Sequence, residues 1–277
     1  MESPQVISKP QRYREIFAVT LLKTLAVGIG ITVFVLVASG LTQVSEQNQC
    51  NVSVRTLYGE LVTYPTGGDE TDSASLTRAL LRDKDDTNIK AIILDIDSPG
   101  GYPVAGEEVA RALQDLGKPS VAVIRNIGAS AAYWAATGAT HILASRSSDV
   151  GSIGVIVSFP DESAKNEREG ILYNEFSSGK FKNLGTPTRP VTAEEKILLE
   201  EGINEVFVHF VEVVARARNL DIAKVMKMAD GRTMTGERAK EEGLIDEVGG
   251  FLEAKKYLET TLLDKPVLCE PNAEPLF

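Results

Sequence analysis

The chain has 277 residues, of which 43% are hydrophobic and 25% are charged, a composition typical of globular proteins. Its 39 acidic residues outnumber its 29 basic ones and give a net charge of −10, which argues against binding to nucleic acid. With only two cysteines and two histidines, a zinc site built from these residue types is nearly excluded.

An apolar segment lies near the N-terminus. Residues 24–41 are 18 successive residues without a charge, and a helix of this length spans about 27 Å, nearly the thickness of a bilayer core. Residues 1–15 carry a net charge of +1, which favours the cytoplasm. We therefore expect a cytoplasmic segment over 1–15, a transmembrane anchor in an inner or plasma membrane over 16–42, and all later residues on the outer side. A cleavable signal peptide is the alternative, because Val37-Ala38-Ser39 offers small residues at a cleavage site.

Residues 43–263 are predicted to form one α/β domain, followed by an extended tail over 264–277. Short apolar runs alternate with segments of helical periodicity, and such repeated βαβ units imply a parallel sheet with right-handed crossovers. A capping box formed by Thr192 and Glu195 marks the start of a long helix. The predicted strands are 91–96, 120–125, 141–144, 150–159 and 171–176, and the predicted helices are 104–116, 130–137, 192–219, 235–242 and 251–262.

The two cysteines, Cys50 and Cys269, both follow the predicted anchor. On the outer side of a membrane they would meet oxidising conditions, in which a disulfide is one possibility. Two unrelated cysteines are the other, because pairing cannot be read from spacing.

Candidate catalytic residues must be found largely without histidine. His141 and His209 lie in apolar segments and are interpreted as structural, which argues against a Ser-His-Asp triad. A lysine made neutral by burial is the remaining way to activate a serine. Ser130 follows a strand and opens a helix, although a serine at this place is more often an N-cap. The paired Gly100 and Gly101 follow another strand, where they form either an oxyanion hole or an ordinary turn.

Five motifs taken together resemble the signal peptide peptidase A family. Members of this family are membrane-anchored serine proteases with a crotonase-like, Clp-protease-like fold. The resemblance covers about residues 52–262. The motifs are Asp97-Ser-Pro-Gly-Gly101, Gly128-Ala-Ser-Ala-Ala-Tyr-Trp134, Gly151-Ser-Ile-Gly-Val155, Ser178-Gly-Lys-Phe-Lys182, and Asp230-Gly-Arg followed by Gly243-Leu-Ile-Asp-Glu-Val-Gly249.

The resemblance assigns a role to each matching residue. Ser130 matches the nucleophile and Lys182 the lysine general base, so that the two form a Ser-Lys dyad. Ser152 matches a serine that orients the lysine. The N–H of Gly101 matches one oxyanion donor, and the N–H of Ala131 is expected to be the second.

Two positions leave questions open. The family has Asn where this chain has Asp97, which affects the local hydrogen bonding. Lys180 lies two residues before Lys182, on the same face of an extended strand, and is the alternative base. Both lysines could also be solvated loop residues.

The resemblance implies acyl transfer by a serine endopeptidase that needs no cofactor or metal. Its expected substrates are signal-peptide remnants or other extended apolar peptides, and its expected partners are the lipid bilayer and further copies of the chain in a homo-oligomeric ring. Two alternatives are a catalytically inactive crotonase-like membrane scaffold and an acyl-CoA enzyme, although the latter usually lacks an anchor and a Ser-Lys pair.

Overall fold

The computed structural model describes residues 50–262 and 265–269. The predicted cytoplasmic segment and the predicted anchor over 16–42 lie outside this part of the chain. Within the described ranges, no helix combines the length and the apolar character that crossing a bilayer requires. The description below concerns the compact unit that begins at Asn51.

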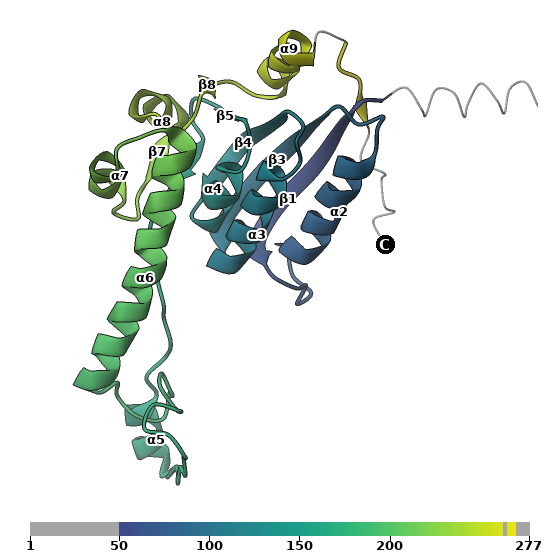
Figure 1. The fold of residues 1–277 in the computed structure, drawn as a ribbon. Helices are drawn as coiled ribbons and strands as arrows, with labels where there is room; N and C mark the ends of the chain where they lie inside the picture. The colour runs from purple at the N-terminus through teal and green to yellow at the C-terminus, as the bar shows by residue number, and fades with distance from the viewer. Residues whose placement is uncertain (1–49, 263–264, 270–277) are drawn as a thin grey trace, which may run out of the picture. The chain divides into compact units, whose positions relative to one another are not determined.

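A mainly parallel sheet forms the centre of this unit (Figure 1). Its main path runs in the order β2-β1-β3-β4-β5-β8, and all neighbours on this path are parallel. In addition β9 pairs with β1, and β6 pairs with β4 and, in antiparallel fashion, with β7. The strands are β1 (Val52–Val62), β2 (Glu70–Asp72), β3 (Ala91–Gly101), β4 (Ser120–Ala129), β5 (His141–Ala144), β6 (Asp149–Gly151), β7 (Thr233–Thr235), β8 (Glu247–Val248) and β9 (Leu268–Cys269).

Helices cover both faces of the sheet. α2, α3 and α4 pack on one face, whereas α9 packs on the other (Figure 1). The predicted parallel α/β architecture is therefore confirmed. The helices are α2 (Ser73–Asp85), α3 (Pro103–Gln114), α4 (Ala131–Ala136), α5 (Ser163–Glu169), α6 (Ala193–Arg218), α7 (Ile222–Met228), α8 (Gly236–Glu242) and α9 (Phe251–Leu262).

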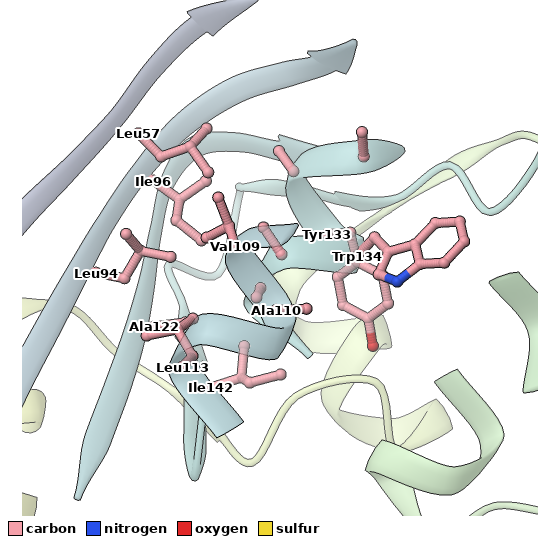
Figure 2. Packing of buried hydrophobic residues seen from close by; sticks show 14 of the residues in the cluster. Leu57, Leu94, Ile96, Val109, Ala110, Leu113, Ala122, Tyr133, Trp134 and Ile142 are labelled. Atoms are coloured by element: carbon pink, nitrogen blue, oxygen red, sulfur yellow. The ribbon is translucent and has the colours of Figure 1, made fainter. Parts of the chain in front are cut away.

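The side chains of β3 alternate between two hydrophobic clusters. Leu94 and Ile96 point into the larger cluster beneath α2, α3 and α4, where they meet Val109 of α3 (Figure 2). Ile93 points to the opposite face and packs in the cluster that contains Leu258 of α9. Full burial of such a side chain stabilises the fold by about 1.5–3 kcal/mol, so β3 is fixed from both sides.

The long helix α6 is joined to the core through its C-terminal half. The ring of Phe210 stacks on Trp134 of α4 with 4.6 Å between ring centroids, and both residues are buried. Val211, Val214 and Ala215 are also buried. The 26 residues of α6 make a helix about 39 Å long, and its N-terminal half extends away from the sheet (Figure 1).

Most predicted elements are found close to their expected positions. The strand over 141–144 has the predicted bounds, and the capping box at Thr192 and Glu195 opens α6 as expected. The predicted strand over 150–159 is wrong beyond Gly151, because β6 ends there. The predicted strand over 171–176 is also wrong: no strand forms there, and Leu172 and Phe176 are 87% and 98% exposed.

The cysteines and the start of the tail are part of the fold. Cys50 and Cys269 are each disulfide-bonded, which decides between the two possibilities left open above. Leu268 and Cys269 are extended and pair with Val52 and Ser53 of β1. The segment 265–269 therefore completes one side of the sheet.

Candidate active site

Ser130 lies where β4 turns sharply into α4. Its backbone has φ +53° and ψ −125°, a conformation that residues with a side chain rarely adopt. Its N–H donates to the Gly151 carbonyl at 2.8 Å, which fixes the turn. The Ser130 side chain makes no capping hydrogen bond to α4. The N-cap interpretation of Ser130 is therefore excluded, and its hydroxyl is not used to hold the helix.

Ser130 lines an open cavity of about 630 Å³. Apolar side chains and one face of α6 form much of the wall, and Ser152 is also part of it. Two carboxylates and one amide add polar groups. The lining residues are Ser130, Ser152, Gly154, Val155, Ile156, Glu200, Ile203, Asn204, Phe207, Ala229, Asp230 and Gly231.

Ser152 is the second strained serine at this cavity. It has φ +50°, and its N–H and hydroxyl donate to the carbonyls of Arg232 at 3.0 Å and Gly231 at 2.9 Å. In the part of the chain that is described, Asn219 is the only other residue besides glycine with positive φ, and it ends α6 as a left-handed C-cap. Ser130 and Ser152, whose positive φ is not explained by a helix C-cap, thus line the same cavity.

The paired glycines after β3 lie directly against the start of α4. A Cβ added at Gly100 would lie 2.7 Å from Cβ of Ser130 and 2.9 Å from the nitrogen of Ala131. A Cβ added at Gly101 would lie 2.1 Å from the carbonyl oxygen of Leu61. Only glycine therefore permits this close approach. As the first residue of α4, Ala131 has an N–H without an acceptor inside the helix.

Asp97 has a clear structural role in this chain. Its Oδ1 accepts a hydrogen bond from the N–H of Ile127 at 3.2 Å, and the adjacent Ser98 Oγ accepts one from the N–H of Gly100 at 3.1 Å. The carbonyl oxygen of an Asn side chain could accept the same bond as Asp97. The change from Asn to Asp is thus compatible with the turn.

Lys182 is exposed and is not among the residues that line the cavity. Its N–H donates to the Gly179 carbonyl at 3.1 Å, and its ammonium group has no ion pair or hydrogen bond with any described residue. Lys180 instead pairs with Glu194 at 2.5 Å. Within one chain, the structure does not bring either predicted base to the Ser130 hydroxyl.

The segment that carries both lysines is fastened to the first turn of α6. The Nη1 and Nη2 atoms of Arg189 donate to the two carboxylate oxygens of Glu195 at 2.8 and 2.6 Å. These bonds, together with the N–H of Thr192, lower the pKa of Glu195 to about 2. Glu195 and Phe207 are 12 residues apart, or about 18 Å along the helix axis. The lysine segment therefore lies near the end of α6 that is farther from the core.

The two histidines are structural, as expected. His141 stacks on Tyr257 with 4.0 Å between ring centroids, and its Nδ1 lies 3.9 Å from Asp246. His209 meets the edge of Trp134 at 5.3 Å. Neither histidine lines the cavity.

One wall of the cavity and one contact that shapes it were missed by the sequence analysis. Four residues of α6 that line it, Glu200, Ile203, Asn204 and Phe207, have the spacing i, i+3, i+4, i+7 and therefore share one helix face. This mixed polar and apolar stripe could have been found in the sequence. The turn around Gly231 belongs to the motif that begins at Asp230, but its contact with Ser152 could not be found in the sequence, because it joins residues 79 positions apart.

Comparisons with known proteins match this chain to a family of peptidases. The family model described as "Peptidase family S49" matches residues 112–263, a range that contains Ser130, Ser152 and Lys182. A protein of Methanocaldococcus jannaschii whose name describes it as a protease is 41% identical over 179 residues, which are 64% of this chain and 57% of that protein. A protein of Enterococcus faecium named as a signal peptide peptidase SppA is 32% identical over 190 residues, 67% of this chain and 55% of that protein. The chain thus spans little more than half the length of these two relatives.

A solved structure of a membrane-bound stomatin-specific protease has a similar fold. It superimposes with a TM-score of 0.52 at 18% identity, over 75% of this chain and 84% of that one. At this identity the likeness concerns the fold alone, and it confirms the predicted fold class. With the family match over more than half of its residues, the chain belongs to peptidase family S49.

Proposed function

We propose that this chain is a serine endopeptidase in which Ser130 is the nucleophile. One observation carries the proposal: Ser130 is held in a strained backbone conformation at a cavity, with a hydroxyl that caps no helix. A strained turn between a strand and a helix is a recurring way to expose a nucleophilic serine. Membership of a peptidase family supports the same reaction class.

The oxyanion of the tetrahedral intermediate would be bound by the N–H groups of Gly101 and Ala131. The N–H of Tyr102 donates to the Leu61 carbonyl at 2.9 Å. Because successive N–H groups of an extended strand alternate in direction, the N–H of Gly101 faces away from β1 and toward the side of Ser130. Removing one such donor typically lowers kcat by about 10²–10³-fold.

Lys182 is proposed as the general base, with Ser152 as the residue that orients it. A neutral Lys182 amine would take the proton of the Ser130 hydroxyl as Oγ attacks the peptide carbonyl. The resulting lysine ammonium would then protonate the leaving amine, and the same lysine would activate the water that hydrolyses the acyl-enzyme. This chemistry requires no cofactor.

Because Lys182 does not line the cavity of its own chain, we propose that a neighbouring copy supplies it in a homo-oligomer. The segment around it exposes apolar side chains, among them Leu172 and Phe176, which are 87% and 98% exposed. An exposed apolar patch of this kind is typical of an interaction surface. A second copy would cover it and would bury the lysine, and burial in general favours the neutral form of an amine.

The mixing of two inactive variants tests this arrangement. Ser130→Ala and Lys182→Ala proteins should each lack activity, whereas a mixture that exchanges subunits should regain up to about a quarter of the wild-type rate on random assortment. A mixture that exchanges subunits but stays inactive would exclude a base supplied by the neighbouring copy.

The proposed substrates are signal-peptide remnants or other extended apolar peptides. Val155, Ile156, Ile203 and Phe207 give the cavity an apolar wall that fits an apolar side chain. We further propose that residues 16–42 anchor the chain in a membrane with the peptidase domain on the outer side. The disulfide-bonded state of both cysteines supports an oxidising compartment.

Hydrolysis of an apolar peptide library by the full-length protein tests the activity. We expect cleavage by the wild type and none by Ser130→Ala at an equal amount of folded protein. The Ser130→Ala variant should fold, because Ser130 makes no side-chain capping bond whose loss would destabilise α4. Cleavage by Ser130→Ala at the wild-type rate would refute the assignment, and a folded wild type without any hydrolysis would favour the inactive scaffold.

A further inference from the structure

The turn formed by Asp230, Gly231 and Arg232 is closed by its own side chains. The Asp230 carboxylate accepts a hydrogen bond from the N–H of Arg232 at 3.1 Å and binds its guanidinium group, with the shortest contact at 2.6 Å. Gly231 has φ +85°, and a Cβ there would meet no atom within 4 Å. The glycine is therefore required by the backbone conformation and not by a lack of space.

This turn holds Ser152 and Ile153 through three hydrogen bonds, two of which Ser152 makes itself. The N–H and Oγ of Ser152 donate to the carbonyls of Arg232 and Gly231, and the N–H of Gly231 donates to the carbonyl of Ile153 at 3.2 Å. Ser152 has φ +50°. Such a conformation persists only where its surroundings impose it, and the turn supplies the bonds that impose it here.

The bond from Ser152 to Gly231 also determines whether the Ser152 hydroxyl can act as a donor or as an acceptor toward another group. A serine hydroxyl has one hydrogen, and that of Ser152 is donated to the Gly231 carbonyl. Toward any further partner, Oγ can act only as an acceptor. A neutral lysine amine has two N–H donors and one lone pair, so an amine that donates to Ser152 can direct its lone pair toward the Ser130 hydroxyl.

We propose that Asp230 and Arg232 are positioning residues, which act through Ser152 and fix its hydroxyl as the acceptor that orients the catalytic lysine. This inference rests on the proposed function, since it needs a lysine base at the Ser130 cavity. Asp230 and Gly231 themselves line that cavity, so the turn is correctly placed for this role.

A double-mutant cycle on the full-length protein tests the proposal. Ser152→Ala and Asp230→Ala should each lower kcat by about ten- to hundredfold, with little change in KM. If Asp230 acts only through Ser152, the double variant should be no slower than Ser152→Ala within about twofold. The pH midpoint of kcat/KM should move to lower pH in both single variants, because the acceptor oxygen that stabilises the ammonium form is lost in Ser152→Ala and is no longer held in place in Asp230→Ala.

Asp221→Ala is the matched control. Asp221 makes the same local bond, from the N–H of Ala223 to its Oδ1 at 2.7 Å, but it does not line the cavity. Its kcat and pH midpoint should match those of the wild type. Should Asp230→Ala fail to fold, Asp230→Asn retains an acceptor for the N–H of Arg232 while it loses the charge. The loss of kcat in Asp230→Asn should be smaller, and it should likewise not multiply with the loss of kcat in Ser152→Ala.

Two failures can be told apart. If Ser130→Ala is inactive but the effects of Asp230→Ala and Ser152→Ala multiply, or Asp230→Ala leaves the pH midpoint unchanged, the positioning role is overturned and the proposed function stands. If Ser130→Ala retains the wild-type rate, the proposed function falls and the positioning role falls with it.

Discussion

Replacement of Gly100 by alanine should inactivate the enzyme through the shape of the turn alone. The new Cβ would lie 2.7 Å from Cβ of Ser130 and 2.9 Å from the nitrogen of Ala131. Carbon atoms pack best at about 3.5–4.0 Å, so the turn and the start of α4 must separate by roughly 1 Å. A displacement of this size costs about 10²-fold in rate, and the loss of one oxyanion donor costs a similar factor.

Gly67→Ala is a matched control for backbone strain. Gly67 has φ +101° against +103° for Gly100, and a Cβ at Gly67 would meet no atom within 4 Å. Both variants should lose about 1–2 kcal/mol of unfolding free energy from the left-handed backbone, and Gly100→Ala should lose more because of the overlap. Steady-state peptide hydrolysis should give a kcat for Gly67→Ala within about twofold of wild type and a drop of about 100-fold or more for Gly100→Ala. An active Gly100→Ala enzyme would refute the placement of the oxyanion turn.

Three further predictions concern the base, the joint between α6 and the core, and the segment that carries the lysines. Lys182→Arg should lower kcat/KM by about 10²–10⁴-fold, because a guanidinium cannot act as a base, whereas Lys180→Ala should stay active in the same peptide assay. An active Lys182→Arg would move the base to Lys180. Phe210→Ala should lower the free energy of unfolding in urea by about 3–5 kcal/mol, and a loss below about 1 kcal/mol would contradict its buried stack. The pKa of Glu195 is about 2, against an ordinary value of 4.5. Its contribution to the stability of this segment is therefore complete above pH 4.5 and is lost as the pH falls toward 2. Limited proteolysis near Arg189 should therefore become faster over this window in the wild type, and Glu195→Gln should show no such step.

The parallel sheet could be predicted because its signals are local. The run 91–96 and the segment 141–144 are short, branched and bounded by turns, and both form strands of the sheet. The strand predicted over 150–159 ends at Gly151 for a reason that the apolar pattern does not show. Ser152 takes φ +50° to bond with the turn around Gly231, and this conformation ends β6. The bonds between Ser152 and this turn thus override an apolar pattern that favours a strand.

The site could be predicted only in part. Ser130 and the glycine pair lie beside elements with clear patterns, and the structure brings them into contact. The apolar pattern of 171–176 suggested a strand, but Leu172 and Phe176 are exposed, as expected of side chains that a partner covers. The position of Lys182 relative to Ser130 cannot be predicted from patterns within one chain, because the proposed contact depends on a second copy.

Covalent labelling with a fluorophosphonate tests the assignment of the nucleophile most directly. After reaction of the full-length protein and digestion with trypsin, mass spectrometry should find the label in the peptide 126–146, on Ser130 and not on Ser145. Ser130→Ala should remain unlabelled, and Lys182→Ala should be labelled more slowly because its serine lacks the base. A label on any other serine, or none on a folded wild type, would contradict the account.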